Sequence, residues 1–312
     1  MPAILTVTLN PAVDISTETD RLLPSHKLRC APSQRFPGGG GINVARVIQR
    51  LGGDCVALYL AGGVVGQQLR HLIALEHLPS LGLAIGGETR ESFSVVEASS
   101  GREYRFVLPG PQVSESEWQA CLAYLDTIGP APDIVVLSGS LPPGLADDSY
   151  ARLAQLARAR GSKIVLDSSG AALAKALAEG VMLIKPSLRE LSELSGHRLD
   201  TQEQQCAAAR QLVDSGRAQL VALSMGEQGA LLVSADGAWR AEALQVAIKS
   251  TTGAGDSFLA AMVWGLTRGM APVDAFRYGV AAGSAALLHS GTLLCLAADV
   301  MRLAPQVRLR PI

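Results

Sequence analysis

The stretch STTGAGDSF, residues 250–258, places one carboxylate behind two glycines and directly before the apolar run FLAAMVWGL. A helix that begins near Gly255 would aim its first free N–H groups and its positive dipole end into the preceding loop. Glycine backbone lets an anion approach closely, which is typical of an anion hole for phosphate. Asp256 could take a proton from an alcohol that attacks phosphorus. The alternative is an acidic first-turn residue behind flexible glycines.

A second glycine-rich stretch, PGGGGINVAR at residues 37–46, precedes an apolar stripe of helical spacing. Backbone without side chains at a helix start can lie against a polyhydroxylated ligand, and Asn43 offers both a donor and an acceptor. Asp14, at the end of TLNPAVD, could accept hydrogen bonds from two sugar hydroxyls. A flexible glycine loop and a turn aspartate are the alternatives.

Other polar stretches follow predicted strands, at the edge where open α/β sheets hold their ligands. They are SGSLPPG (138–144), DSSG (167–170) and KPSLRE (185–190), with the glycine turn SMGEQG (224–229) between two strands. Neither GxxxxGK[ST] nor GxGxxG occurs, so a nucleotide would not bind through a P-loop or a dinucleotide fingerprint.

The composition bounds the class of protein. The chain has 312 residues, of which 48% are hydrophobic, enough for one large core or a core with a small appendage. A net charge of −1 argues against nucleic acid as a main partner. The five scattered cysteines form no disulfide or zinc pattern, and no apolar stretch reaches the roughly 18 residues that cross a bilayer. The N-terminal stretch is typical of a strand rather than a signal peptide, so we expect a cytoplasmic protein without a membrane partner.

Apolar runs alternate with helical patterns along most of the chain. We predict strands at 3–9, 55–61, 133–139, 163–169, 181–187, 219–225 and 229–235. Most of these runs are continuously apolar, as in strands buried on both faces. Ser114 and Glu117 form a capping-box pattern before one predicted helix. The alternation predicts one α/β domain over residues 1–312, with a mostly parallel central sheet flanked by helices.

Two segments depart from this alternation and predict a small β-sheet lid. Residues 12–36 are polar and are expected to be irregular, whereas residues 88–108 alternate as a hairpin around Ser99–Arg102. An isolated two-stranded hairpin is marginally stable. We therefore expect its apolar face to pack on a second subunit, which predicts a homodimer through the lid.

The order and spacing of PGGGGINVAR, GSLPPG, KPSLREL and STTGAGDSF resemble the ribokinase-like, phosphofructokinase B type carbohydrate kinases over essentially the whole chain. The stretches TLNPAVD, TRESF, REYRFVLPG and AAGSAALLHSGTLLC are most similar to the minor bacterial ATP-dependent 6-phosphofructokinases within that family. The resemblance implies a ribokinase-like fold, ATP and Mg²⁺ as cofactors, a sugar phosphate as substrate and K⁺ as a further cation.

The resemblance also implies roles for individual residues. Asp256 would deprotonate the sugar C1 hydroxyl, and the backbone of Gly253, Ala254 and Gly255 would stabilise the moving phosphoryl group. The sugar would be lined by Asp14, Gly39, Gly40, Gly41, Asn43, Gly139 and Ser140, and its phosphate by Lys27, Arg90 and Arg105. ATP would run along Lys185, Ser187, Ser224, Met225, Gly226, Glu227, Gln228 and Gly229, past Ile248 to Val280 and Ser284. Glu190 would act on Mg²⁺ through water, and K⁺ would lie against carbonyls near Ser250, Thr252, Ala286, His289 and Gly291.

Some positions depart from the pattern of these relatives. Ser187 stands where the family motif KPN has asparagine, which bears on the handling of Mg²⁺ and on any inhibitory second nucleotide. His289 and Leu293 replace an asparagine and an arginine, which bears on the K⁺ site. In the similar kinases of fructose 1-phosphate and tagatose 6-phosphate, a lysine stands at the place of Gly40.

These observations predict a kinase that phosphorylates fructose 6-phosphate at C1 and gives fructose 1,6-bisphosphate. A 1-phosphofructokinase or a tagatose-6-phosphate kinase is the nearest alternative. A kinase of nucleosides or unphosphorylated sugars would not need Arg90 and Arg105 at the pocket. A non-catalytic sugar-phosphate or nucleotide sensor on the same fold would not need the base Asp256.

Overall fold

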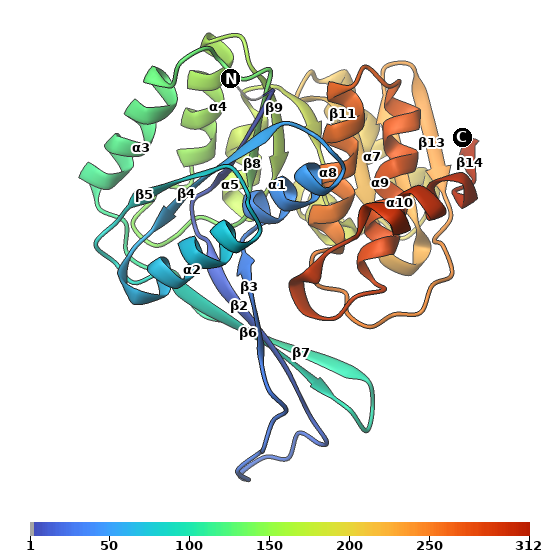
Figure 1. Cartoon of the computed structure of the whole chain (residues 1–312). Helices are drawn as coiled ribbons and strands as arrows, with labels where there is room; N and C mark the ends of the chain where they lie inside the picture. The colour runs from blue at the N-terminus through green and yellow to red at the C-terminus, as the bar shows by residue number, and fades with distance from the viewer. Residues whose placement is uncertain (1–2) are drawn as a thin grey trace.

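The computed structural model describes residues 3–312 and is built around one ten-stranded sheet (Figure 1). The strand order is β14-β13-β12-β11-β10-β9-β8-β1-β4-β5. The parallel strands are β1 (Ile4–Thr8), β4 (Cys55–Ala61), β5 (Ser80–Ala84), β8 (Ile134–Ser138), β9 (Lys163–Asp167), β10 (Val181–Ile184) and β11 (Ala218–Ser224). An antiparallel end follows, made of β12 (Ala230–Ser234), β13 (Gly237–Ala241) and β14 (Leu309–Pro311). The predicted mostly parallel α/β sheet is confirmed.

Helices cover both faces of this sheet and create two separate cores. On one face lie α1 (Gly40–Arg50), α2 (Gly63–Leu75), α8 (Ala254–Thr267), α9 (Pro272–Ala286) and α10 (Ala297–Leu303). On the other lie α3 (Glu115–Thr127), α4 (Ser149–Ala159), α5 (Gly170–Leu177), α6 (Leu188–Ser195) and α7 (Gln202–Asp214). Successive strand residues alternate between the cores: Val136 belongs to the core that includes α8 and α9, whereas Val135 belongs to the core that includes α3 and α4. This two-sided burial explains the continuously apolar strands.

The seven predicted strands are all present, although their observed ends differ from the predicted ones by up to three residues. The predicted capping box is also confirmed: Ser114 Oγ accepts a hydrogen bond from the Glu117 amide at 3.4 Å, and Glu117 Oε2 accepts one from the Ser114 amide at 2.7 Å. Three strands of the central sheet were not predicted, namely β5, β13 and β14. Each is short and partly exposed, so its apolar pattern is weak. Short 3₁₀ turns η1 (Gly226–Gln228), η2 (Gly291–Leu293) and η3 (Ala304–Gln306) complete the chain.

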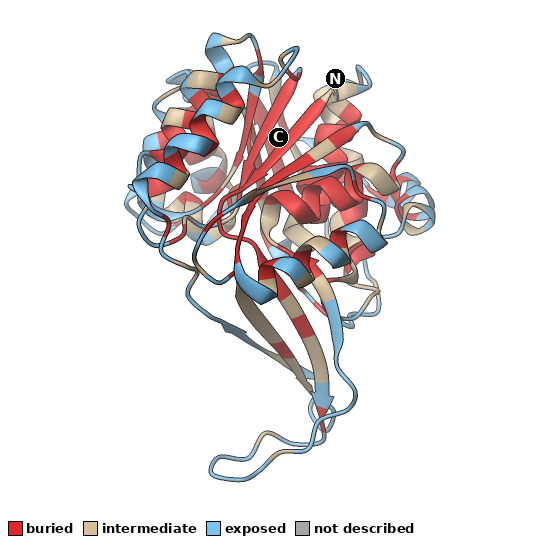
Figure 2. Ribbon diagram, turned by 60° about the vertical axis from the view of Figure 1, so that its left-hand side comes forward, coloured by how far each residue is buried: buried red, intermediate tan, exposed pale blue. Residues whose placement is uncertain are grey.

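A second, four-stranded sheet projects from the body and forms the lid (Figure 2). Its order is β3 (Gln34–Gly38), β2 (Ala12–Thr19), β6 (Arg90–Glu97) and β7 (Arg102–Val107). The prediction that residues 12–36 are irregular was wrong, because 12–19 and 34–38 form strands. The sequence of β2 is too polar to indicate a strand, but β2 pairs in parallel with β6, from Ala12↔Arg90 to Thr19↔Glu97. Such non-local pairing gives a polar segment neighbours that its own sequence does not reveal.

The topology creates one crevice at the carboxyl ends of the central strands. β1 pairs in parallel with β4 on one side and with β8 on the other, so the order in which successive strands are added to the sheet reverses at this point. Ligands of open α/β sheets bind at such a switch point. The lid strand β2 begins four residues after β1 ends, and therefore lies over the same crevice. Within residues 3–312, no helix has both the length and the apolar character needed to span a bilayer.

Candidate active site

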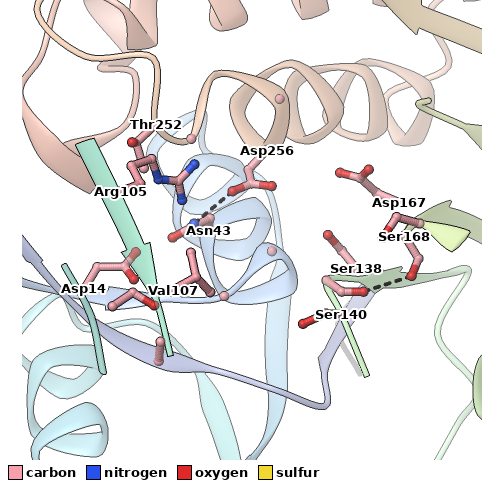
Figure 3. A pocket seen from close by; sticks show the side chains of 18 of the residues that line it. Asp14, Asn43, Arg105, Val107, Ser138, Ser140, Asp167, Ser168, Thr252 and Asp256 are labelled. Carbon is pink, nitrogen blue, oxygen red and sulfur yellow. Dashed lines mark hydrogen bonds between the residues drawn. The ribbon is translucent and has the colours of Figure 1, made fainter. Parts of the chain in front are cut away.

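A cavity of about 530 Å³ lies between the carboxyl ends of the central strands, the lid and the start of α8 (Figure 3). Its walls combine glycine backbone, hydroxyls, carboxylates and basic side chains. They are formed by Ala12, Asp14, Gly39, Gly40, Asn43, Arg90, Ser92, Arg105, Val107, Ser138, Gly139, Ser140, Asp167, Ser168, Ser169, Lys185, Glu190, Thr251, Thr252, Gly253, Gly255 and Asp256. The two glycine-rich stretches, more than 200 positions apart, meet here.

The start of α8 forms the floor of the cavity. Gly253 is the N-cap of this helix and has a φ of +76°, a backbone conformation that residues with side chains rarely adopt. A Cβ atom on Gly253 would also lie 2.3 Å from Leu294 Cδ2. The first free N–H groups of the helix therefore border the cavity without cover, and Asp256 lies in the first helical turn. The helix start and the carboxylate for which the sequence predicts an anion hole thus lie side by side at the cavity.

Asn43 holds Asp256 in place from the opposite wall. The Asn43 side-chain amide donates a hydrogen bond from Nδ2 to Asp256 Oδ2 at 2.9 Å. The other end of that amide, Oδ1, accepts a hydrogen bond from Arg46 Nη1 at 3.2 Å. Because a guanidinium can only donate, this contact identifies the Asn43 oxygen and directs the NH₂ group at the carboxylate.

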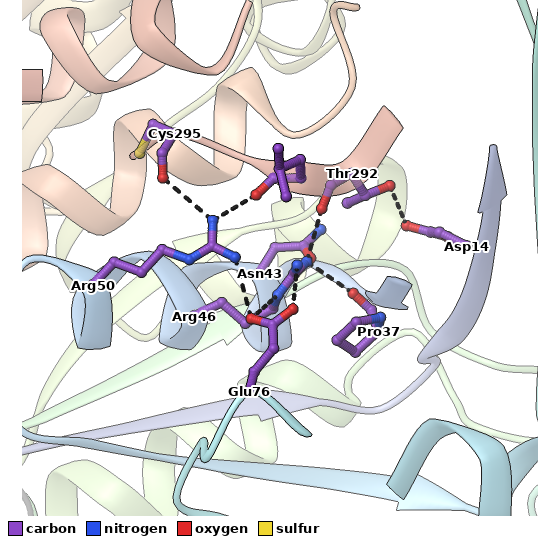
Figure 4. Close-up of polar contacts among 9 residues, drawn as sticks. Asp14, Pro37, Asn43, Arg46, Arg50, Glu76, Thr292 and Cys295 are labelled. Atoms are coloured by element: carbon purple, nitrogen blue, oxygen red, sulfur yellow. Dashed lines mark hydrogen bonds and ion pairs between the residues drawn. The ribbon is translucent and has the colours of Figure 1, made fainter. Parts of the chain in front are cut away.

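Arg46 is a buried charge that organises several segments around Asn43 (Figure 4). Its exposed fraction is 0%, and Glu76, directly after α2, pairs with it at 2.6 Å. Its Nη1 also donates to the carbonyl oxygens of Pro37 and Thr292, each at 3.0 Å. A buried guanidinium without these partners would be strongly destabilising. Arg46 therefore ties the glycine loop and η2 to α1.

Burial gives the cavity aspartates Asp256 and Asp14 a raised proton affinity. Burial raises the pKa of Asp256 above its ordinary value of 3.8, and the Asn43 hydrogen bond and the charge of Lys185 partly oppose this effect. Burial likewise raises the pKa of Asp14, although the hydrogen bond from Thr292 Oγ1 at 2.9 Å opposes it. A carboxylate of this kind accepts a proton more readily than an exposed one.

Lys185 and Asp167 form an ion pair at the next strand ends, with 3.2 Å between Nζ and Oδ1. Burial raises the pKa of Asp167 to about 6, with the positive charge of Lys185 acting in the opposite direction. Burial alone would lower the pKa of Lys185, but the carboxylates of Asp167, Asp256 and Glu190 raise it overall. Lys185 therefore remains a cation between three acidic groups.

Two lid arginines supply positive charge to the cavity. Arg90 is held by the carbonyl oxygens of Leu108 at 3.1 Å and Asn10 at 2.9 Å, whereas its buried Nε has no hydrogen-bond partner within residues 3–312. Arg105 reaches in from β7 toward Asn43 and Asp256 (Figure 3). A buried donor without a partner at a cavity wall favours an anionic ligand.

Most residues predicted for the sugar and for catalysis line this cavity. They are Asp14, Gly39, Gly40, Asn43, Arg90, Arg105, Gly139, Ser140, Gly253, Gly255 and Asp256. Ala254 is the first residue of α8, and Gly41 packs behind the cavity wall against Thr8. Lys27 is exposed in the segment between β2 and β3, outside the cavity of its own chain.

The residues predicted for the nucleotide extend away from the cavity along the carboxyl ends of β10 and β11. Lys185 and Glu190 line the cavity, whereas Ser187 joins the 224–229 turn through a bridge to Ser224. The exposed fraction of Ile248 is 59%, and Val280 and Ser284 lie on α9. The other members of this group, Met225, Gly226, Glu227, Gln228 and Gly229, form the turn between β11 and β12.

Ser187 has a structural role that its spacing from Glu190 could have indicated, because the spacing repeats the capping-box pattern of Ser114 and Glu117. Its hydroxyl accepts a hydrogen bond from the Glu190 amide at 3.3 Å, and Glu190 Oε2 accepts one from the Ser187 amide at 2.8 Å. The two residues thus form a capping box at the start of α6. Glu190 lines the cavity with its carboxylate already engaged by backbone.

No set of three or more His, Cys, Asp or Glu side chains that could hold a metal ion occurs in the part of the chain that the structure describes. Isolated carboxylates at the wall of this cavity fit Mg²⁺, which keeps several waters and is bound by one or two carboxylates plus substrate phosphates. Of the residues predicted for K⁺, Thr252 lines the cavity, whereas His289 Nε2 lies 3.0 Å from Asp299 Oδ2. Ser250 is buried beside Thr252, and Ala286 and Gly291 lie at the end of α9 and in η2.

Some cavity residues were not assigned from the sequence. Ser138, Asp167 and Ser168 belong to stretches recognised as strand ends, so their position in the sheet could have assigned them. Ser92 and Val107 could not be assigned, because only the pairing of the lid strands turns them toward the cavity. Arg46 gave no signal of burial, since charged residues are usually exposed.

Comparison with known proteins agrees with this fold. A family model described as pfkB family carbohydrate kinase matches residues 7–299. The ATP-dependent 6-phosphofructokinase isozyme 2 of Mycobacterium tuberculosis (strain ATCC 25618 / H37Rv) is 44% identical over 301 residues, covering 96% of this chain and 88% of that protein. The 1-phosphofructokinase of Bacillus subtilis (strain 168) is 33% identical over 282 residues, covering 90% of this chain and 91% of that protein.

Solved structures are also similar. Phosphofructokinase-2 from Escherichia coli in complex with substrates and products has a TM-score of 0.93 and 40% identity, covering 97% of this chain and 98% of that chain. The same E. coli protein in complex with potassium has a TM-score of 0.93 and 40% identity, covering 98% and 99%. Its tetrameric inhibited form has a TM-score of 0.91 and 39% identity, with the same coverage.

The fold and the cavity define a ribokinase-like carbohydrate kinase. Because the family model spans most of the chain, the protein belongs to the pfkB family of carbohydrate kinases. The predicted family and fold are therefore confirmed.

The position of Asp256 generates a first prediction. We expect Asp256→Asn to lower kcat by about 10²–10⁴-fold, because the amide keeps the shape of the carboxylate but cannot take the proton. Binding of sugar and of ATP, measured by calorimetry, should stay close to that of the unmodified protein. A variant that keeps more than about a tenth of the rate would exclude Asp256 as the base.

The electrostatics of the cavity generate a second prediction. Because burial raises the pKa of Asp256, kcat should fall on the acid side at a higher pH than an ordinary aspartate with a pKa of 3.8 would give. Removing the positive charge of Lys185 raises this pKa further, so Lys185→Met should move the acid limb to higher pH. The exposed Lys163, on β9, provides the control Lys163→Met, which should leave the limb in place. Superimposable profiles of kcat against pH for Lys185→Met and the unmodified protein would contradict the prediction.

Proposed function

We propose that this protein transfers the γ-phosphoryl group of ATP to the C1 hydroxyl of fructose 6-phosphate, giving fructose 1,6-bisphosphate and ADP in the cytoplasm. The observation that carries the proposal is the cavity itself, which places the carboxylate of Asp256 at an uncovered helix start together with two arginines of the lid. Membership of a carbohydrate kinase family and the names of the relatives support the reaction class.

Different cavity residues bind the sugar, accept the proton and stabilise the transferred phosphoryl group. Asp14 and the Asn43 amide hold sugar hydroxyls, with Gly39, Gly41, Gly139 and Ser140 shaping the wall around them. Asp256 takes the proton of the C1 hydroxyl as its oxygen attacks the γ-phosphorus and the bond to ADP breaks. The N–H groups at the start of α8 stabilise the negative charge on the moving phosphoryl group.

The sugar phosphate is bound by arginines from the lid. Arg90 is already oriented by two carbonyl oxygens and keeps a free Nε, so it can donate to a phosphate without rearrangement. Arg105 adds a second guanidinium. A side chain at Gly40 would require Ser138 to move, because its Cβ would lie 2.2 Å from Ser138 Oγ. The present orientation of Ser138 therefore does not accommodate the lysine that similar kinases of fructose 1-phosphate carry at this position.

ATP lies along Lys185, Ser187 and the 224–229 turn, toward Ile248, Val280 and Ser284. Mg²⁺, when bound, would neutralise phosphate charge, and Glu190 would hold it through water. The carbonyls near Ser250, Thr252, Ala286, His289 and Gly291 would hold K⁺. The potassium complex of the similar E. coli protein supports this cation.

The nearest alternative is a kinase of fructose 1-phosphate or of tagatose 6-phosphate. A relative named 1-phosphofructokinase is 33% identical, compared with 44% for a relative named ATP-dependent 6-phosphofructokinase isozyme 2. A non-catalytic sensor would not retain a buried carboxylate aligned by Asn43.

The lid also supports association of two chains into a homodimer. It projects from the body with exposed apolar side chains, among them Leu23 and Phe106, which are 46% and 51% exposed. Lys27, outside the cavity of its own chain, would lie close to a sugar phosphate only if it came from the lid of a second chain.

The sugar specificity is the decisive test of this function. In a coupled assay, kcat/KM for fructose 6-phosphate should exceed kcat/KM for fructose 1-phosphate, tagatose 6-phosphate and free fructose. Arg90→Ala should raise KM for fructose 6-phosphate far more than KM for ATP. The control is Arg35→Ala, which removes a lid arginine that pairs with Glu91 outside the cavity. A higher kcat/KM for fructose 1-phosphate would overturn the sugar assignment and leave the kinase class intact.

The subunit arrangement has its own test. Light scattering at low micromolar concentration should give the mass of two chains, and Phe106→Asp should shift the protein toward one chain, because it introduces a charge into the apolar surface of the lid. Val64→Asp, at a 75% exposed apolar residue of α2, is the matched control. A single chain with full activity would refute the lid dimer.

A further inference from the structure

The lid strand β7 carries a carboxylate, Glu103, that contacts the loop directly before α8. Glu103 Oε1 accepts hydrogen bonds from Ser250 Oγ at 2.9 Å and from Thr252 Oγ1 at 3.3 Å. Oε2 accepts from Ser250 Oγ at 3.0 Å and from the Thr251 amide at 3.3 Å. Ser94 Oγ, on the neighbouring strand β6, also donates to Oε1. One lid side chain therefore holds all three residues of the loop.

These bonds form a partly buried anchor next to the anion hole. The exposed fractions of Ser250 and Thr252 are 3% and 5%, so little water reaches these two residues, whereas Thr251 is exposed and Glu103 is half-buried. Hydrogen bonds to a carboxylate are stronger than neutral ones. The following residue, Gly253, is the N-cap of α8, and Leu294 packs so closely against it that a side chain at this position would clash. The position of the loop consequently sets where the first N–H groups of α8 point.

Glu103 lies on the same strand as Arg105, the second arginine proposed to bind the sugar phosphate. Side chains two positions apart on a strand point to the same face, which places Glu103 and Arg105 on the cavity side of β7. β7 is the edge strand of the lid and pairs only with β6. An anion that binds Arg105 therefore holds the same strand that carries Glu103.

A carboxylate at this place is not suited to bind the substrate. Its negative charge would repel a phosphate group, and both of its oxygens are already engaged by four donor groups of the loop and of β6. The chemistry of Glu103 is that of an anchor between the lid and the loop.

We propose that Glu103 is a positioning residue that couples binding of the sugar phosphate on the lid to the geometry of the anion hole. This inference rests on the proposed function, since it takes fructose 6-phosphate as the ligand of Arg105. It predicts that the sugar phosphate and the nucleotide bind with positive cooperativity that depends on Glu103.

The experiment measures that cooperativity directly. The dissociation constant of a non-hydrolysable ATP analogue is determined by calorimetry with and without saturating fructose 6-phosphate. In the unmodified protein the sugar should tighten the analogue by about 5- to 150-fold, the usual range of coupling between two sites. In Glu103→Gln this factor should fall to about one, and kcat should fall, whereas the affinity for the analogue alone should be unchanged.

Two further variants separate coupling from a structural role. Glu91→Gln removes another lid carboxylate, which pairs with Arg35 and not with the loop, and should keep the full coupling factor. Ser250→Ala breaks the same anchor from the loop side, and should lower the factor without adding to the effect of Glu103→Gln in the double variant. In the unmodified protein, fructose 6-phosphate alone should slow amide hydrogen exchange in residues 250–253.

The inference is overturned if the unmodified protein shows no coupling, if Glu103→Gln keeps the full factor, or if the sugar leaves exchange at 250–253 unchanged. The exchange measurement needs no variant, so a poorly folding Glu103→Gln does not prevent the test. Failure of the proposed function would look different, because the unmodified protein would then neither bind nor phosphorylate fructose 6-phosphate.

Discussion

The hydrogen bond between Asn43 and Asp256 joins two helix starts that lie 213 positions apart in the chain, and the cavity depends on it. Its geometry requires that α1 and α8 begin side by side over the central sheet. Arg46 maintains this arrangement, because its buried guanidinium binds Asn43, the glycine loop and η2 and is neutralised by Glu76. Polar groups that satisfy one another without water thus hold the carboxylate beside the anion hole.

The central sheet and the lid make different contributions to the same site. The body supplies rigid elements, since strands buried on both faces hold the backbone at 138–140, 167–169 and 185 against two packed cores. The lid supplies positive charge from Arg90 and Arg105 on strands with fewer buried contacts. Glu103 is the point at which the two parts meet beside α8. A kinase with this division can bind the sugar on one part and perform the transfer on the other.

Local patterns in the sequence predicted much of the fold and many of the residues that line the cavity. The apolar strands, the capping box at Ser114 and the helix start at 253–256 depend on neighbours within a few residues, and all of them are present. The polar strand β2 was missed because its stability comes from β6, which follows more than 70 residues later. The burial of Arg46 could not be predicted either, since nothing in PGGGGINVAR indicates that Glu76 pairs with it.

The sequence by itself determined which chemical groups are available: a carboxylate behind glycines, a glycine loop with an amide, and arginines in an alternating hairpin. Backbone preferences and apolar periodicity are local properties, and therefore they can be recognised without a structure. Only the tertiary structure decided which groups meet. It turned Arg90 and Arg105 into the cavity and left Lys27 outside, and it placed Glu103 against the loop before α8. These outcomes depend on strand pairing and on the path of the lid over the sheet, which are set by contacts between distant parts of the chain.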